Sequence, residues 1–268
     1  MKLYSFLVAL MLASAMAGQV LAQQIVLAPD SGSSFSDRWK WGMEQGDATL
    51  GYTVAGTSDD WGSGSSQSLA SALYRSGAVV STGQDWPLTV LVTIKDSVIQ
   101  RISARSLRYS GPSDVARILW LGEASQEESF ELLSSLSLSG DALRGSVYAI
   151  SYHRDVRAAG PWIKRFLDPS GGVETRKTAA YSYAGYAGNE AAGVLVELAL
   201  SDRSLEVAKA AAYALAGNLD SDRAVESLGL LIQRSNRFEV RKAAVYALGN
   251  ADSDDARRIL LRLILEES

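Results

Sequence analysis

The amino-acid sequence predicts a mainly α-helical protein, an α-solenoid of about five helix pairs preceded by a small β-containing domain. Three observations support this fold class: a motif that recurs every 32 or 33 residues in the second half, alternating apolar residues in the first half, and a change of composition near residue 110. Repeats of this length are typical of stacked helix pairs, because neither helix can bury its apolar stripe alone. We therefore divide the chain into residues 1–22, 23–110 and 111–268.

The first 22 residues have the order of features of a secretory signal peptide. Lys2 precedes an apolar stretch over residues 3–13, and small side chains suited to signal peptidase end at Ala22. A membrane anchor is the alternative, but the apolar stretch is short and Ser14 and Gly18 follow it, whereas a bilayer core needs about 20 apolar residues. We expect an exported chain in the bacterial periplasm or extracellular space, cleaved after Ala22 and without stable membrane insertion.

The composition of the 268-residue chain excludes several kinds of chemistry. It has no cysteine and one histidine, so it has no disulfide, no thiolate nucleophile and no cluster of imidazole ligands. Its formal net charge is -4, and loss of the leader's single cation makes it -5, which argues against general nucleic-acid binding. The paired Asp-Ser-Asp runs at 220–222 and 252–254 lack the glycine and distal glutamate of a calcium loop. We therefore expect no metal, no cofactor and no nucleic-acid partner.

The segment from 23 to 110 predicts strands. Leu50, Tyr52 and Val54 alternate with smaller or polar residues, and Pro87 to Ala104 has the pattern of a β-hairpin that turns at Asp96-Ser97. Between these strands, Ser66 to Tyr74 predicts a short helix.

Tryptophans are frequent in and beyond this domain, at 39, 41, 61, 86, 120 and 162. Alternation across Lys40 predicts that Trp39 and Trp41 share one face of a strand. Two interpretations are open. The rings form an aromatic platform for a sugar or peptide, or they cover the core of a small sheet, where aromatic side chains pack well.

The repeat begins at Asp141, Glu174, Glu206 and Glu239. In the last copy, Val240, Ala244, Ala247 and Leu248 form one helical stripe, which predicts the buried face. A second helical pattern follows each copy, for example Ala191, Val194, Leu195, Leu198 and Ala199. Residues 113–122 complete the set as an irregular first helix, which gives about five pairs.

The run Val240-Arg241-Lys242-Ala243-Ala244-Val245-Tyr246-Ala247-Leu248-Gly249, followed by an acidic turn and a Leu-rich helix, identifies the repeat type. It lacks the Thr-Pro-Leu-His of ankyrin repeats and the Trp, Gly and Tyr spacing of tetratricopeptide repeats. It resembles HEAT-like repeats of the short type that phycobilin lyases also contain, over roughly residues 113–268. That resemblance implies a binding scaffold, or chromophore-lyase activity as in a few members.

Two positions of each repeat suggest a binding surface. The fourth residue of every copy is basic and the eighth is tyrosine, so the two lie on one helical face. The basic residues are Arg144, Lys177, Lys209 and Lys242, and the tyrosines are Tyr148, Tyr181, Tyr213 and Tyr246. Tyrosine is an efficient interface residue, and this row is a hypothetical partner-binding surface. Alternatively, the rings pack between repeats and the bases pair with the acids three residues earlier.

No catalytic constellation accompanies these patterns. His153 lies in the turn after a first helix, where we expect a solvated loop histidine, and the chain has no Gly-x-Ser-x-Gly nucleophile motif. The favoured interpretation is an exported, non-catalytic scaffold that binds a protein partner. The alternatives are a lyase-like or cofactor-holding helper, and a glycan- or peptide-binding module that uses the N-terminal tryptophans.

Overall fold

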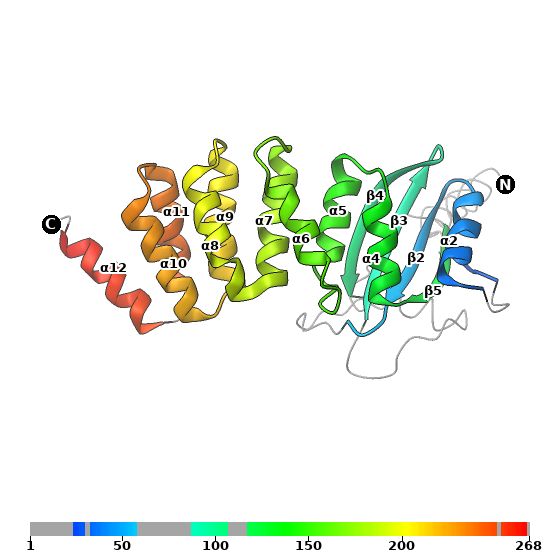
Figure 1. Ribbon diagram of the computed structural model, residues 1–268, viewed down its shortest axis with the longest axis horizontal. Helices are drawn as coiled ribbons and strands as arrows, with labels where there is room; N and C mark the ends of the chain where they lie inside the picture. Colours follow the sequence, from blue (N-terminus) through cyan, green and yellow to red (C-terminus); the bar gives the residue numbers. More distant parts are fainter. Residues whose placement is uncertain (1–23, 30–32, 58–86, 107–116, 251–252, 267–268) are drawn as a thin grey trace, which may run out of the picture.

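The computed structural model describes residues 24–29, 33–57, 87–106, 117–250 and 253–266. A β-sheet forms the N-terminal end of an elongated molecule, and helices follow it in a row towards the C-terminus (Figure 1). The leader, the expected helix at 66–74, Trp61 and Trp86 lie outside the described residues.

The sheet has five strands in the order β1-β5-β2-β3-β4. The strands are β1 (Gln24–Leu27), β2 (Ala48–Val54), β3 (Leu88–Lys95), β4 (Val98–Ser106) and β5 (Arg117–Ala124). The expected strand around Tyr52 and the expected hairpin are confirmed, since β2, β3 and β4 pair antiparallel. Asp96 and Ser97 turn the hairpin with positive φ angles of 52° and 60°, as a tight two-residue hairpin turn requires.

The expected helix over residues 113–122 is wrong, because Arg117–Ala124 is strand β5. It lies between β1 and β2 and pairs parallel with both. Its continuous apolar run, Ile118 to Leu121, is buried throughout, and such a run is typical of a strand covered on both faces. A short apolar run has no period that separates helix from strand. The sheet therefore extends to Ala124, beyond the expected boundary at 110.

The tryptophan pair at 39 and 41 lies on a helix, α2 (Phe35–Glu44), and not on a strand as expected. Ser34 and Asp37 form a capping box that begins this helix. Phe35, Trp39 and Gly42 are its buried residues, at a helical spacing that faces the sheet. The absent side chain at Gly42 lets the helix approach Leu50 closely.

The remaining chain is helical. After the single helix α4 (Gln126–Ser135) come α5 (Gly140–Ile150), α6 (Ala159–Lys164) with the 3-10 turn η2 (Arg165–Leu167), α7 (Val173–Ala187), η3 (Gly188–Ala191), α8 (Ala192–Ser201), α9 (Leu205–Asn218), α10 (Ser221–Arg234), α11 (Phe238–Gly249) and α12 (Asp254–Glu266). The first helices α5, α7, α9 and α11 pack side by side in that order (Figure 1). From Gln126 on, the described residues contain four helix pairs and the single helix α4, because strand β5 stands where the first helix of a fifth pair was expected.

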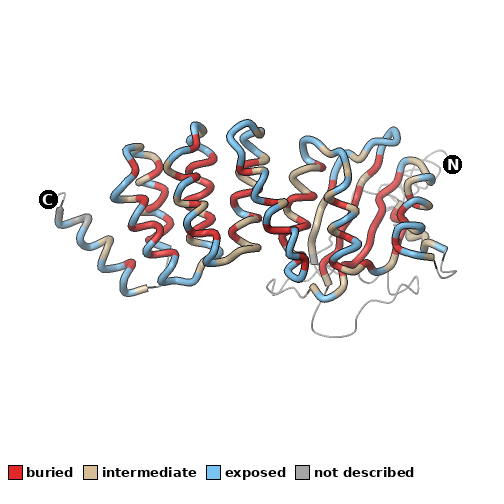
Figure 2. The backbone as a smooth tube through the Cα atoms, in the orientation of Figure 1, coloured by how far each residue is buried: buried red, intermediate tan, exposed pale blue. Residues whose placement is uncertain are grey.

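The core continues from the sheet into the helix row (Figure 2). The buried stripe predicted for the last first helix is confirmed, with Val240, Ala244, Ala247 and Leu248 all buried. Alanine is frequent at these contacts because its small side chain lets helices approach closely. The same side of α9 buries Ala208, Ala211 and Leu215 among others.

The seam between sheet and helices is formed by α5 against β4. A Cβ atom at Gly145 would collide with the backbone carbonyl of Ile102, so only glycine fits there. Later repeats carry Thr178, Ala210 and Ala243 at the same position. The first repeat differs because its helix packs against a strand instead of another helix.

Candidate functional site on the first helices

The row of basic residues and tyrosines lies on the four neighbouring first helices. Each helix carries one pair: Arg144 and Tyr148 on α5, Lys177 and Tyr181 on α7, Lys209 and Tyr213 on α9, and Lys242 and Tyr246 on α11. Tyr181 is 43% exposed and Tyr246 is 68% exposed, whereas Tyr148 and Tyr213 are half-buried. The structure therefore brings the predicted residues together on one side of the stack.

The tyrosine rings contact one another and retain exposed surface. The rings of Tyr213 and Tyr246 meet edge to face with centroids 6.5 Å apart, and the hydroxyls of Tyr148 and Tyr152 lie 2.7 Å apart. Partial burial raises the pKa of Tyr181, as does its neighbour Tyr213, while Lys177 acts in the opposite direction. Neighbouring repeats thus hold the rings in place without covering them completely.

The cations of the row differ in their pairing. Arg144 forms an ion pair with Asp141, three residues earlier. The Nζ atom of Lys177 lies 2.9 Å from Glu174 and 3.3 Å from Glu206 of the next repeat, and these hydrogen bonds raise the pKa of Lys177. Within the described part of the chain, Lys209 and Lys242 make no ion pair. The C-terminal half of the row therefore presents cations that are not neutralised by neighbours.

A third row was missed by the sequence analysis. Val173, Leu205 and Phe238 are the first residues of α7, α9 and α11, and their exposed fractions are 36%, 39% and 64%. Each lies four residues before the cation of its helix, and therefore on the same face. The signal was present in the sequence, because an apolar residue precedes the acidic start of each of these three repeats. We call the surface formed by the apolar, cationic and tyrosine rows of α7, α9 and α11 the ladder face.

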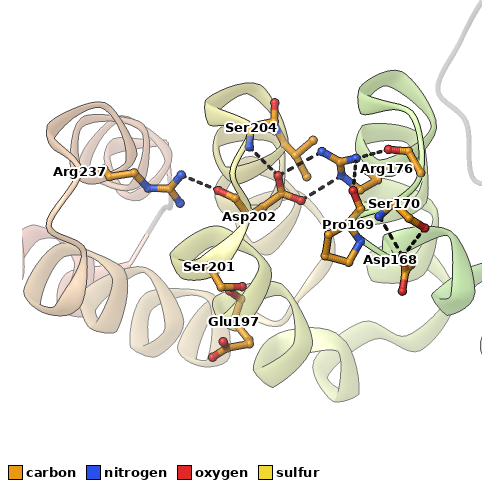
Figure 3. Close-up of polar contacts among 11 residues, drawn as sticks. Asp168, Pro169, Ser170, Arg176, Glu197, Ser201, Asp202, Ser204 and Arg237 are labelled. Carbon is orange, nitrogen blue, oxygen red and sulfur yellow. Dashed lines mark hydrogen bonds and ion pairs between the residues drawn. The ribbon is translucent and has the colours of Figure 1, made fainter.

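A buried ion pair between Arg176 and Asp202 lies at the turns of the helix stack (Figure 3). The guanidinium of Arg176 donates to both carboxylate oxygens of Asp202, from Nε at 3.0 Å and from Nη2 at 3.2 Å. The backbone N–H of Ser204 donates to the same carboxylate at 2.7 Å. Arg237 donates to the carbonyls of Asp202 and Ala199, each at 2.6 Å, and so satisfies the end of α8. These contacts link the starts of the three first helices α7, α9 and α11, because Ser204 and Arg237 are the N-cap residues of α9 and α11.

The expectation of a solvated loop at His153 is wrong, because this residue is completely buried. Its Nδ1–H donates to the carbonyl of Ala149 at 3.0 Å, and its Nε2 has no hydrogen-bond partner. Burial lowers the pKa of His153 to about 4, although backbone hydrogen bonds act in the opposite direction. In the same turn, the hydroxyl of Tyr186 of α7 donates to the carbonyl of Val156 at 3.1 Å.

The described tryptophans do not form an exposed platform. Trp39 and Trp120 are buried, and Trp41 and Trp162 are half-buried, the latter beneath the guanidinium of Arg165 at 4.7 Å. Trp39 lines a groove of about 420 Å³ between α2 and α4, together with Phe35. The other lining residues are Ser34, Ser36, Glu128, Glu131, Leu132 and Ser135.

In the ranges that the structure describes, no three His, Asp or Glu residues gather in a way that could hold a metal ion. None of the helices in those ranges is long and apolar enough to cross a membrane.

A match to a protein-family model supports the repeat type. Residues 192–268 match the family model for HEAT repeats. A solved structure of the complex of CpcE and CpcF of phycocyanin lyase from Nostoc sp. PCC7120 is similar over 52% of this chain and 98% of that chain, at 19% identity and a TM-score of 0.34. No curated protein matches. The C-terminal part of the chain is thus a HEAT-like repeat region, preceded by a five-stranded sheet.

Proposed function

We propose that the chain is an exported, non-catalytic scaffold whose α-solenoid binds a protein partner through the ladder face. The observation that carries this proposal is the alignment of three kinds of side chain on neighbouring helices. Exposed apolar residues, cations and tyrosines occupy the same three positions on α7, α9 and α11. Such a surface offers apolar contact area and hydrogen-bonding groups together, which is the mixture found at protein interfaces.

The framework under the ladder face supports this role. The Arg176–Asp202 pair and the Arg237 hydrogen bonds link the starts of α7, α9 and α11, so the rows are held at a fixed spacing before any partner arrives. A surface held in this way loses little conformational entropy on binding. Extended surfaces of this kind are what repeat proteins use for binding.

Binding of a protein partner through the ladder face is tested by affinity capture from an envelope fraction, with the mature chain as bait. We compare the wild type with a chain carrying Phe238→Ser and Tyr246→Ser. The matched control is Leu230→Ser, because Leu230 is also an exposed apolar residue but lies on the second helix α10. We expect the same partner with wild type and control and its loss with the double substitution. Equal recovery by all three chains would exclude the ladder face as the binding surface.

Export is part of the same proposal and has its own test. The order of Lys2, the apolar stretch and the small residues before Ala22 supports cleavage by signal peptidase. Expression with the native leader followed by fractionation and N-terminal sequencing should give a chain that begins at Gln23 outside the cytoplasm. A full-length chain that remains in the cytoplasm would contradict export.

A further inference from the structure

On the sheet, away from the ladder face, lie two arginines that have no counter-ion among the described residues. Arg101 and Arg105 are on the edge strand β4, with Ser103 between them. Alternate residues of a strand point to opposite faces, and Ile102 is buried in the core. Arg101, Ser103 and Arg105 therefore share the face of β4 that is opposite to this core.

Neither guanidinium has a partner within the described residues. Arg101 is exposed, but Arg105 is only partly so, and neither guanidinium forms a hydrogen bond or an ion pair with a described residue. Burial and the charge of Arg101 both lower the pKa of Arg105, which places the two like charges within each other's influence. A partly buried arginine normally pairs with a carboxylate or phosphate group, because burying an unpaired charge costs free energy. Arg105 is such a partly buried group, and no carboxylate of the described residues pairs with it.

A second, independent observation lies on the neighbouring strand. Thr89 of β3 is the register partner of Arg105, so the two residues are direct cross-strand neighbours. Its side chain is completely buried, and its hydroxyl has no hydrogen-bond partner in the part of the chain that the structure describes. Buried hydroxyls are nearly always hydrogen-bonded, so an orphan beside an unpaired cation needs an explanation.

The acidic residue of this sheet face lies far from the pair. Glu123 is on β5, and across the sheet its row continues through Thr53 and Thr89 before it reaches Arg105. Neighbouring strands are about 4.8 Å apart, so three strand spacings separate the carboxylate-bearing strand from β4. The cations are thus not neutralised from within the described part of the sheet.

We propose that Arg101, Ser103 and Arg105, with Thr89 beside them, bind a small oxyanion, a phosphate or carboxylate group. The planar fork of a guanidinium donates two parallel hydrogen bonds to either group. An anion bound between Arg101 and Arg105 forms an ion pair with both guanidinium groups. It also accepts hydrogen bonds from the hydroxyls of Ser103 and Thr89, which removes the orphan donor.

The test is calorimetric titration of the mature chain in chloride buffer, with inorganic phosphate in one arm and succinate in the other. We expect saturable binding of at least one anion. Arg105→Gln should weaken it about tenfold, which is the size expected for a lost charge-assisted hydrogen bond. Arg203→Gln is the matched control, because Arg203 is an exposed arginine of the helix stack that makes no ion pair within the described residues.

Thermal melting distinguishes a binding role from a structural one. Arg101→Gln with Arg105→Gln, and separately Thr89→Val, should leave the free chain at least as stable as the wild type. The bound anion should raise the melting temperature of the wild type but not of the double variant. If neither anion binds saturably, or if the double variant binds as well as the wild type, the proposal is wrong. The ladder face is untouched by these changes, so partner capture tests the proposed function separately.

Discussion

The sheet and the helix stack bury their cores by different routes. In the sheet, residues far apart in sequence meet, as Leu50 does with Leu119, and the buried side chains are large. In the stack, each first helix meets the equivalent helix of the next repeat, and many buried residues are alanines. The sheet therefore depends on long-range pairing, whereas the stack depends on contacts between neighbours and on the polar network that holds its turns.

The largest expected loss of stability comes from breaking the Arg176–Asp202 ion pair of the helix stack. Asp202→Ala leaves the buried guanidinium of Arg176 without its carboxylate, and we expect a loss of about 3–5 kcal/mol of unfolding free energy. Urea unfolding measures this loss. Replacing both partners, with Arg176→Met and Asp202→Leu, should recover most of it, because the buried charge then disappears as well. A loss below about 1 kcal/mol for Asp202→Ala would show that the pair does not hold the turns.

The next largest loss of stability is expected at the contact of α5 with β4, where the sheet joins the helix stack. Gly145→Ala places a methyl group against the carbonyl of Ile102, and we expect a loss of about 3 kcal/mol because backbone on both sides must move. The control is Gly193→Ala in α8, where a Cβ meets no atom within 4 Å. That change should stabilise the chain by up to about 1 kcal/mol through helix propensity. If both variants unfold at the same urea concentration, the close approach of α5 to β4 is not required.

The buried histidine makes stability depend on pH. Its pKa is about 4 in the folded chain, against about 6.5 in an unfolded chain, so the unfolded state binds the proton first as pH falls. The contribution of His153 is complete above about pH 7, decreases between pH 6.5 and pH 4, and amounts to about 3 kcal/mol over that range. We expect His153→Gln, which keeps a hydrogen-bond donor, to remove this decrease. Parallel stability curves for wild type and variant would contradict the burial of a neutral imidazole.

The ladder face gives the smallest effect on stability. Phe238→Ser and Tyr246→Ser change side chains that are 64% and 68% exposed, and each should alter the free energy of unfolding by no more than about 0.5 kcal/mol. Thermal melting of the single variants measures this. A loss of about 2 kcal/mol or more would assign the two rings to packing between repeats instead of to a binding surface.

The repeat made the stack predictable from the sequence and left the sheet only partly so. The stripe around Ala244 was correctly predicted because its contacts recur with a fixed period. Strand β5 was not, because its buried run has no period and its partners lie far away in sequence. The capping box of Ser34 and Asp37 outweighed the apparent alternation of Trp39 and Trp41.

The candidate site shows the same division. The basic and tyrosine rows could be read from the repeat, and so could the apolar row at Val173, Leu205 and Phe238, which the analysis missed. The ion pair between Arg176 and Asp202 joins residues 26 positions apart, and the turn that contains His153 is bonded at Val156 by Tyr186 of the next repeat. No periodic pattern in one segment specifies such contacts.

Photo-crosslinking in the native envelope tests the ladder face most directly. A photoreactive phenylalanine analogue replaces Tyr181, Tyr246 or, as the control on α10, Leu230 in otherwise unchanged chains. We expect the same protein to be crosslinked from the positions of Tyr181 and Tyr246 and not from that of Leu230. A partner crosslinked only from the position of Leu230, or none from any of the three, would contradict a scaffold that binds through its first helices.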